Sequence, residues 1–252
     1  MNGLDIIKAR AFLGGGGGSG GSGVGVKVTP LTVTENGTYT AESGMAYSPV
    51  TVNVAAQGGG GDLDALIDRS ITEVHNNANK VGTYAFYSCT KLITVDFPNA
   101  TSAESRAFEN CSALKSLNIP NAYSIGMSAF ANCSGLESVE LPKVSEILGS
   151  AFKGCGNLKT VDIHSTVSLT GASFSGCNVL NSFILRSSEV STLLATNVFT
   201  STNLKIYVPS ALVDTYKAAT NWSTYASRFR ALEDYTVDGT IYGEMDWAKM
   251  AA

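Results

Sequence analysis

A 22-residue repeat constrains the fold of this chain more than any other feature of its sequence. Phenylalanine, cysteine and leucine each recur five times at this spacing between residues 86 and 180. The two most regular columns are Phe86, Phe108, Phe130, Phe152 and Phe174, and Cys89, Cys111, Cys133, Cys155 and Cys177. Several columns with one shared period predict a solenoid, in which each repeat buries its apolar residues against the neighbouring repeats.

A short apolar strand pattern follows the leucine of each repeat, at residues 95–97, 117–119, 139–141, 161–163 and 183–185. A sixth, degenerate copy ends at 206–208, so about six coils are expected. The strands should stack into a parallel sheet with about 4.8 Å between coils. Proline ends four of them because it removes a backbone donor and fixes φ; these prolines are Pro98, Pro120, Pro142 and Pro209, whereas His164 and Arg186 replace proline in two coils. Short helical turns are expected on the opposite wall, beginning at Ala85 and Phe86.

The motif A-F-x-x-C-x-x-L-x-x-V-x-L-P resembles the BspA-like leucine-rich repeats. Its cleanest copy runs from Ala129 to Pro142, and the resemblance covers roughly residues 63–232. Residues 64–71 look like an N-terminal cap, and residues 207–216 and 221–225 resemble the end of the family's repeat domain. Ser210 is placed as the N-cap of a terminal helix that would cover the last coil.

The regions that flank the repeats show a second resemblance. Residues 34–40 and 47–54 look like modules of tail and virion structural proteins encoded by prophages of gut bacteria, and residues 235–246 are similar to their C-terminal tails. This similarity implies a component of a phage particle, made in the bacterial cytoplasm, that displays a leucine-rich-repeat recognition domain. A bacterial cell-surface adhesin of the BspA-like kind is the alternative.

Two glycine tracts divide the chain. Nine of the 26 glycines lie in residues 14–25 and four in 58–61, where they predict flexible linkers. The expected order is an anchoring segment at 1–13, a linker at 14–25, a small β module at 26–56 and a linker at 57–61. The solenoid with its N-terminal cap follows at 62–208, then a helical cap at 209–232 and a β-hairpin or tail at 233–252.

The first 13 residues contain apolar side chains at helical spacing, namely Leu4, Ile7, Ala11 and Phe12. They predict a docking segment through which residues 1–25 bind other virion proteins, although a frayed terminus is the simpler interpretation. Charged residues Asp5, Lys8 and Arg10 interrupt this segment, so no secretory signal is predicted.

The β module is expected to be antiparallel, because Asn36 and Gly37 form a hairpin signal between two alternating segments. About thirty residues in three strands are too few for an independently stable sheet. The module is therefore predicted to pack on a neighbour or to associate, and a homo-oligomer, preferably a trimer, is expected.

The residues available for chemistry are few. No paired carboxylate motif surrounds His75 or His164 in the sequence, and no catalytic residue, metal site or cofactor is predicted. The five cysteines are expected to be buried free thiols, although neighbouring coils would place them close enough for disulfides. A net charge of -4 argues against nucleic-acid binding, and no apolar stretch is long enough to span a membrane.

The outward-facing strand positions are the candidate binding site. They form two columns on one face of the solenoid, and the column between the apolar strand positions changes from acidic to apolar along the chain. The candidate residues are Thr94, Asp96, Ser116, Asn118, Ser138, Glu140, Thr160, Asp162, Ile184 and Tyr207. Stacked carboxylates favour a cation, a basic loop or sugar hydroxyls as partners, and a host-surface glycan or protein is the expected ligand. A solvated polar face without a ligand is the alternative.

Overall fold

The computed structural model describes residues 69, 71–237 and 240–241. The predictions made for residues 1–68 lie outside the described residues. They include the anchor residues Leu4, Ile7, Ala11 and Phe12, both glycine linkers and the antiparallel β module. Most of the predicted N-terminal cap and of the C-terminal tail also lie outside them.

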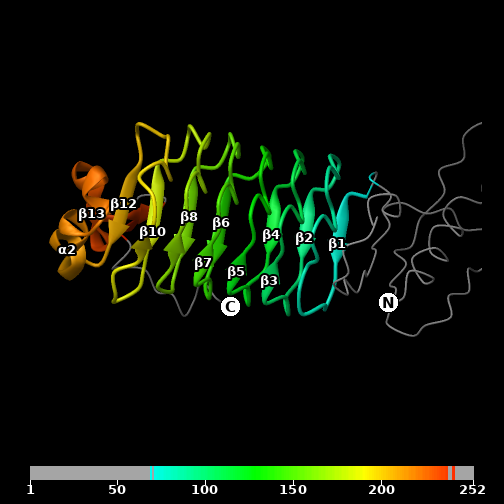
Figure 1. Ribbon diagram of the computed structural model, residues 1–252, viewed down its shortest axis with the longest axis horizontal. Helices are drawn as coiled ribbons and strands as arrows, with labels where there is room; N and C mark the ends of the chain where they lie inside the picture. Colours follow the sequence, from blue (N-terminus) through cyan, green and yellow to red (C-terminus); the bar gives the residue numbers. More distant parts are fainter. Residues whose placement is uncertain (1–68, 70, 238–239, 242–252) are drawn as a thin grey trace, which may run out of the picture.

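The predicted solenoid of parallel strands is confirmed (Figure 1). We call its long row of strands the strand wall, and its paired neighbours are 21 to 23 residues apart; Thr94 pairs with Ser116, for example. The strands are β1 (Glu73–His75), β2 (Thr94–Asp96), β4 (Ser116–Asn118), β6 (Ser138–Leu141), β8 (Thr160–Ile163), β10 (Ser182–Leu185), β12 (Lys205–Val208) and β13 (Phe229–Ala231). Proline ends β2, β4, β6 and β12 within two residues, as predicted.

A second, narrower parallel sheet runs along the solenoid and was not predicted. Its strands are β3 (Ser102–Ala103), β5 (Ser124–Ile125), β7 (Glu146–Ile147), β9 (Ser168–Leu169) and β11 (Thr192–Leu193). Each has two residues, one partly or fully exposed and one buried, which is too short for an alternating pattern to be recognised.

The strand wall is interrupted midway along the solenoid, between β4 and β6 (Figure 1). Among the described residues, no backbone hydrogen bond joins these two strands. The same two coils still pair through β5 and β7. Leu117 of β4 is only partly buried, whereas Val95 and Val139 at the equivalent positions are buried. The coils on either side are therefore joined elsewhere than at the strand wall.

The wall that faces the strands across the core consists of tight turns, and we call it the turn wall. Short helical turns were predicted there, and that prediction is wrong: among the described residues, no helix precedes Ser210. Ala85 and Tyr87 donate their N–H groups to carbonyls three residues earlier, but Phe86 and Ser88 donate to the next coil, at 2.7 Å. In a helix, all N–H groups after the first turn bond to carbonyls of the same segment, and none of them alternates with a bond to another segment. Alternate donation instead joins each turn to the next coil.

A continuous stack of phenylalanine rings lies behind the turn wall. From Phe86 to Phe174, consecutive rings have centroids 5.1–5.3 Å apart and are within 9° of parallel. Phe199 extends the stack at 5.7 Å. Phe174 also meets Phe183 of β10 edge-on at 5.2 Å, so the two walls pack on each other through the core.

The cysteine column lies beside this stack, and all five thiols are free and buried, as predicted. Each Sγ of Cys111, Cys133, Cys155 and Cys177 donates to a phenylalanine carbonyl 25 residues earlier, at 3.1–3.2 Å. Burial raises the pKa of Cys133 well above its usual value. A hydrogen bond with Cys177, together with burial, does the same for the pKa of Cys155. These thiols are thus held protonated, as hydrogen-bond donors.

The last coil is covered by short helices: η2 (Ser210–Leu212), α2 (Val213–Ala218), η3 (Trp222–Arg228) and η4 (Leu232–Asp234). The predicted N-cap role of Ser210 is wrong, because Ser210 is the first residue of η2 and its side chain caps nothing. Its N–H and its hydroxyl both donate to the Glu233 carboxylate, each at 3.2 Å. After η4, β14 (Thr236–Val237) and β15 (Thr240–Ile241) pair antiparallel.

Side chains of this cap replace the coil that would have come next. β11 is the last strand of the narrow sheet, so its outer edge would leave backbone groups unpaired. The Ser191 N–H donates to the Tyr216 hydroxyl at 2.8 Å, and the Trp222 indole donates to the Ser191 carbonyl at 2.7 Å. Asn221 donates to the Leu193 carbonyl at 2.7 Å. The edge is therefore closed by three side chains.

Candidate functional site

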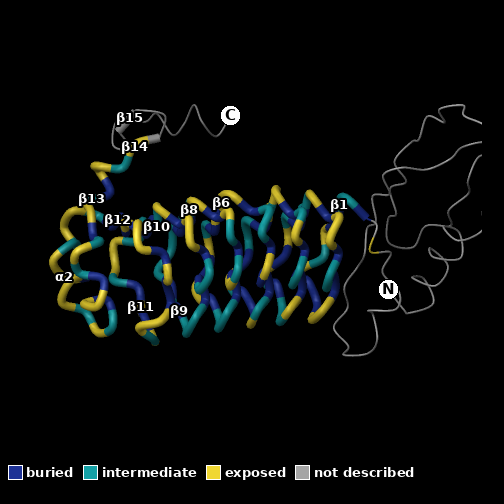
Figure 2. Tube along the Cα trace, turned by 90° about the horizontal axis from the view of Figure 1, so that it is seen from above, coloured by how far each residue is buried: buried dark blue, intermediate teal, exposed yellow. Residues whose placement is uncertain are grey.

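The predicted binding residues of the first coils lie together on the outer surface of the strand wall. We call this surface the strand face; it consists of Thr94, Asp96, Ser116, Asn118, Ser138, Glu140, Thr160 and Asp162. Each of these side chains is exposed or partly exposed, whereas the inward residues Val95, Val139 and Val161 are buried. Figure 2 shows this alternation of exposed and buried positions along the coils. Binding at this face stays a prediction.

Two predicted members of the site do not lie on an open surface. Ile184 is 1% exposed and Tyr207 is 8% exposed, because Leu232 and Tyr235 pack over them. The rings of Tyr207 and Tyr235 meet edge-on, with centroids 4.8 Å apart, and burial raises the pKa of Tyr207. The change from acidic to apolar residues along this column therefore marks a covered part of the wall.

Two residues that replace a strand-ending proline join the strand face. The His164 Nε2 atom lies 3.3 Å from Glu140 Oε1 and 3.5 Å from Asp162 Oδ1, although neither contact is a hydrogen bond. The Arg186 guanidinium binds the Asp162 carboxylate through two bonds, of 2.7 and 2.5 Å. We call Glu140, Asp162, His164 and Arg186 the ion cluster. The loss of proline in two adjacent coils was the sequence signal for it.

A smaller polar group lies at the N-terminal end of the same face. The His75 Nδ1 atom lies 3.1 Å from Asp96 Oδ2, and Asn118 donates to Asp96 Oδ1 at 2.7 Å. Both histidines of the chain therefore contact strand-face carboxylates and are partly exposed. Within the part of the chain that the structure describes, no cluster of three or more histidine, cysteine or acidic residues could hold a metal ion. The carboxylates of the strand face instead contact neighbouring side chains, and Asp162 is paired with the Arg186 guanidinium.

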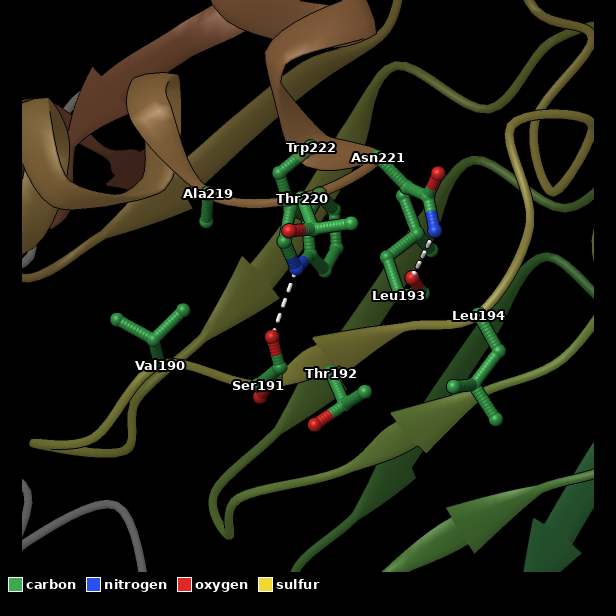
Figure 3. A pocket seen from close by; sticks show the side chains of 9 residues that line it. All are labelled: Val190, Ser191, Thr192, Leu193, Leu194, Ala219, Thr220, Asn221 and Trp222. Atoms are coloured by element: carbon green, nitrogen blue, oxygen red, sulfur yellow. Dashed lines mark hydrogen bonds between the residues drawn. The ribbon is translucent and has the colours of Figure 1, made fainter.

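An open hollow of about 310 Å³ lies between β11 and the cap (Figure 3). Its lining includes Val190, Leu194, Ala219 and the hydroxyls of Thr192 and Thr220, with no charged side chain. Asn221 and Trp222 also line it, and their polar groups are already bonded to the backbone of Leu193 and Ser191. The sequence did not point to this hollow, which arises where the cap meets the last coil.

The sequence profile of the BspA type leucine rich repeat region matches this chain in six copies, over residues 68–178 and 101–219. Together these ranges span more than half of the 252 residues. The chain belongs to this family. Within the described residues of this BspA-type protein, no helix is both long and apolar enough to cross a membrane.

Several solved structures resemble this BspA-type chain. A leucine-rich repeat protein from Bacteroides ovatus is 23% identical, with a TM-score of 0.44, over 56% of this chain and 41% of that protein. The leucine rich repeat protein of T. pallidum is 25% identical, with a TM-score of 0.46, over 58% of this chain and 69% of that protein. Pneumococcal vaccine antigen PcpA is 15% identical, with a TM-score of 0.46, over 71% of this chain and 40% of that protein. No curated protein sequence matches the chain.

Proposed function

We propose that this BspA-type protein is a non-enzymatic recognition component of a phage or prophage particle, and that its strand face binds a host-surface glycan or protein. The supporting observation is a contrast within single strands. The inward positions of β2, β6 and β8 all hold valine, whereas the outward positions next to them hold Asp96, Glu140 and Asp162. The stacking of the coils fixes the inward residues and leaves the outward ones free to suit a partner.

Location in a particle is supported by the flanking segments. Residues 34–40, 47–54 and 235–246 resemble prophage tail and virion modules. In this proposal residues 1–13 attach the chain to other virion proteins through Leu4, Ile7, Ala11 and Phe12, and residues 26–56 form a β module that associates, preferably as a trimer. The solenoid is then displayed away from the attachment point.

Binding by the strand face is tested with a double variant, Ser116→Arg with Ser138→Arg. Both serines are exposed on either side of the interruption between β4 and β6, so arginine there blocks the face without entering the core. The matched control is Val179→Arg, because Val179 is also exposed but lies outside the strand wall. Binding of the labelled chain to intact bacterial cells should fall at least tenfold in the double variant alone. Equal binding by all three proteins would refute the assignment.

Attachment to a particle is tested separately. The polypeptide should be found by mass spectrometry in phage particles purified from an induced culture, and deletion of residues 1–13 should remove it from them. Incorporation of the deleted chain at the normal level would refute the role given to the anchor.

The second candidate is a bacterial cell-surface adhesin. The family match favours it, since that match concerns the repeat domain and is independent of the flanking segments. Recovery of the protein from washed cell envelopes of a culture free of phage would establish this function and exclude the particle component.

A further inference from the structure

The first two described coils have large side chains at a backbone position where later coils have small ones. The position belongs to the turn wall and has a φ of 56–60° in five successive coils, where it is occupied by Tyr84, Arg106, Ser128, Ser150 and Ala172. Bulky L residues rarely adopt this left-handed conformation. Serine at Ser128 and Ser150 meets the same backbone requirement. The stacking of the coils therefore does not explain Tyr84 and Arg106, and strain kept at such a position points to a functional role.

These two large side chains form a cluster with two neighbours. The Arg106 guanidinium lies over the Tyr84 ring, 5.5 Å from its centroid, and Tyr87 meets Tyr84 edge-on at 5.5 Å. Glu109 Oε2 lies 3.5 Å from Arg106 Nε, is shielded from solvent and accepts no hydrogen bond. Even so, Tyr84 is 40% exposed and the Arg106 side chain is 48% exposed. We call Tyr84, Tyr87, Arg106 and Glu109 the aromatic–arginine cluster.

The charges around the cluster are balanced. Arg106 is paired with Glu109, and Lys80 lies 3.8 Å from the carboxylate of Glu104. Both of these cations thus have a carboxylate partner, so the cluster itself carries no excess positive charge to attract a phosphate or another strongly charged ligand. An uncharged ligand fits this surface better.

We propose that the aromatic–arginine cluster is a binding site for an uncharged saccharide, on the turn wall and separate from the strand face. A pyranose ring has an apolar C–H face, which suits the exposed Tyr84 ring and the partly exposed Tyr87 ring, and it has a rim of hydroxyl groups. The phenol groups of Tyr84 and Tyr87 and the guanidinium of Arg106 supply donors and acceptors for that rim.

Toward the C-terminal coils, within the described residues, the positions of this cluster do not continue it into a protein interface. A stable protein interface buries about 800 Å² on each partner and is enriched in aromatic side chains. On the next coils the positions of Tyr84 and Tyr87 hold only small side chains or lysine: Ser128, Ser150, Ala172, Ala131, Lys153 and Ser175. The cluster has the size of a site for one or two sugar rings.

The test uses the full chain and the double variant Tyr84→Ser with Arg106→Ser. Serine is the residue that later coils use at this position, so the variant should fold with an unchanged or higher urea midpoint. The matched control is Tyr123→Ser, because Tyr123 is 51% exposed and lies outside the cluster. The probes are an immobilised array of neutral oligosaccharides and a parallel set of sialylated ones.

The wild-type chain should bind at least one neutral oligosaccharide. The double variant should lose at least tenfold in affinity for it, while Tyr123→Ser stays within twofold. Arg106→Gln, which keeps a long side chain but removes the charge, should lose several-fold. The site is refuted if no neutral oligosaccharide binds, if only sialylated ones bind, or if the double variant binds as well as the wild type. The strand-face variant Ser116→Arg with Ser138→Arg should bind the saccharide normally, so this test is independent of the proposed strand-face function.

Discussion

The turn wall and the strand wall are built from the same repeats, yet they differ in regularity. Along the turn wall, the phenylalanine stack runs without a gap from Phe86 to Phe199, and each cysteine thiol from Cys111 onward repeats one hydrogen bond. The strand wall is interrupted between β4 and β6, and its outward residues change from coil to coil. The comparison indicates that the turn wall holds the coils together, which leaves the strand wall free to vary.

Hydrogen bonding explains this difference. In the turn wall, N–H groups alternate between their own coil and the next one, so a substitution there disturbs two coils at once. On the strand face, the side chains point away from the backbone ladder, and those of Ser116, Ser138 and Glu140 are exposed to solvent. Changing these three residues removes little that stabilises the fold, in contrast to Asp162, which is bonded to Arg186.

The largest expected effect is a difference in the loss of unfolding free energy between a substitution in the turn wall and one in the strand wall of the central coils. Phe130→Ala should lower the free energy of unfolding by about 3–5 kcal/mol, because it leaves a cavity inside the stack. Glu140→Ala should change it by less than about 0.5 kcal/mol, since Glu140 is exposed. Urea unfolding of the full chain measures both, and losses of similar size would contradict the comparison.

A substitution in the cap should cause an intermediate loss of unfolding free energy. Trp222→Phe keeps an aromatic ring in the core but removes the indole N–H that bonds the Ser191 carbonyl. The buried acceptor is left unpaired, which should cost about 1–3 kcal/mol in urea unfolding. Tyr123→Phe, which removes a hydroxyl from an exposed ring, serves as the control and should be neutral. A neutral Trp222→Phe would mean that the edge of β11 needs no such bond.

A substitution in the cysteine column should cause a smaller loss of unfolding free energy. Cys133→Ala removes the thiol donor to the Phe108 carbonyl and about one atom of packing, so a loss of about 1–2 kcal/mol is expected. Ser138→Ala on the strand face should be neutral within about 0.5 kcal/mol. In the native protein, none of the five thiols should react with a thiol reagent until urea unfolds the chain. Rapid labelling of folded protein would contradict the buried, protonated column.

The smallest effect is expected in the pH dependence. Burial raises the pKa values of Cys133 and Tyr216 in the folded state. The unfolded chain therefore loses these protons first as the pH rises, and stability that is complete below about pH 8.5 decreases above it. The urea concentration at the unfolding midpoint should decrease as the pH is raised from about 8.5 to about 10.5. In Tyr216→Phe, this decrease should be smaller only above about pH 10. A midpoint that stays constant over this range would contradict the prediction.

The columns of the repeat made the solenoid and its strands predictable, because stacked coils need the same apolar residue at the same depth. The turn wall was mistaken for short helices, since the spacing of Ala, Phe and Cys also suits a helix. The residue before each cysteine was the missed signal: Ser88, Asn110, Asn132, Gly154 and Gly176 all have a positive φ. Asparagine and glycine tolerate that conformation and would interrupt a helix.

The site was less predictable than the fold for two physical reasons. Ile184 and Tyr207 are covered by Leu232 and Tyr235, which follow much later in the chain, and no local pattern reports such a contact. The interruption after β4 has no signature either, because 117–119 has the same pattern as its neighbours. Exposure along a column depends on residues outside that column.

The interruption between β4 and β6 also has a mechanical consequence. A solenoid bends most easily where the fewest bonds join its coils. Here the strand pairing is missing on the strand wall, while the aromatic stack on the other side is continuous. A load applied to the ends of the solenoid would therefore bend it at this point, around the rings of Phe108 and Phe130. Under such a load, the strand face would move as two rigid halves about a hinge at the interruption. Ser116 and Asn118 lie on one half, and Ser138 and Glu140 lie on the other.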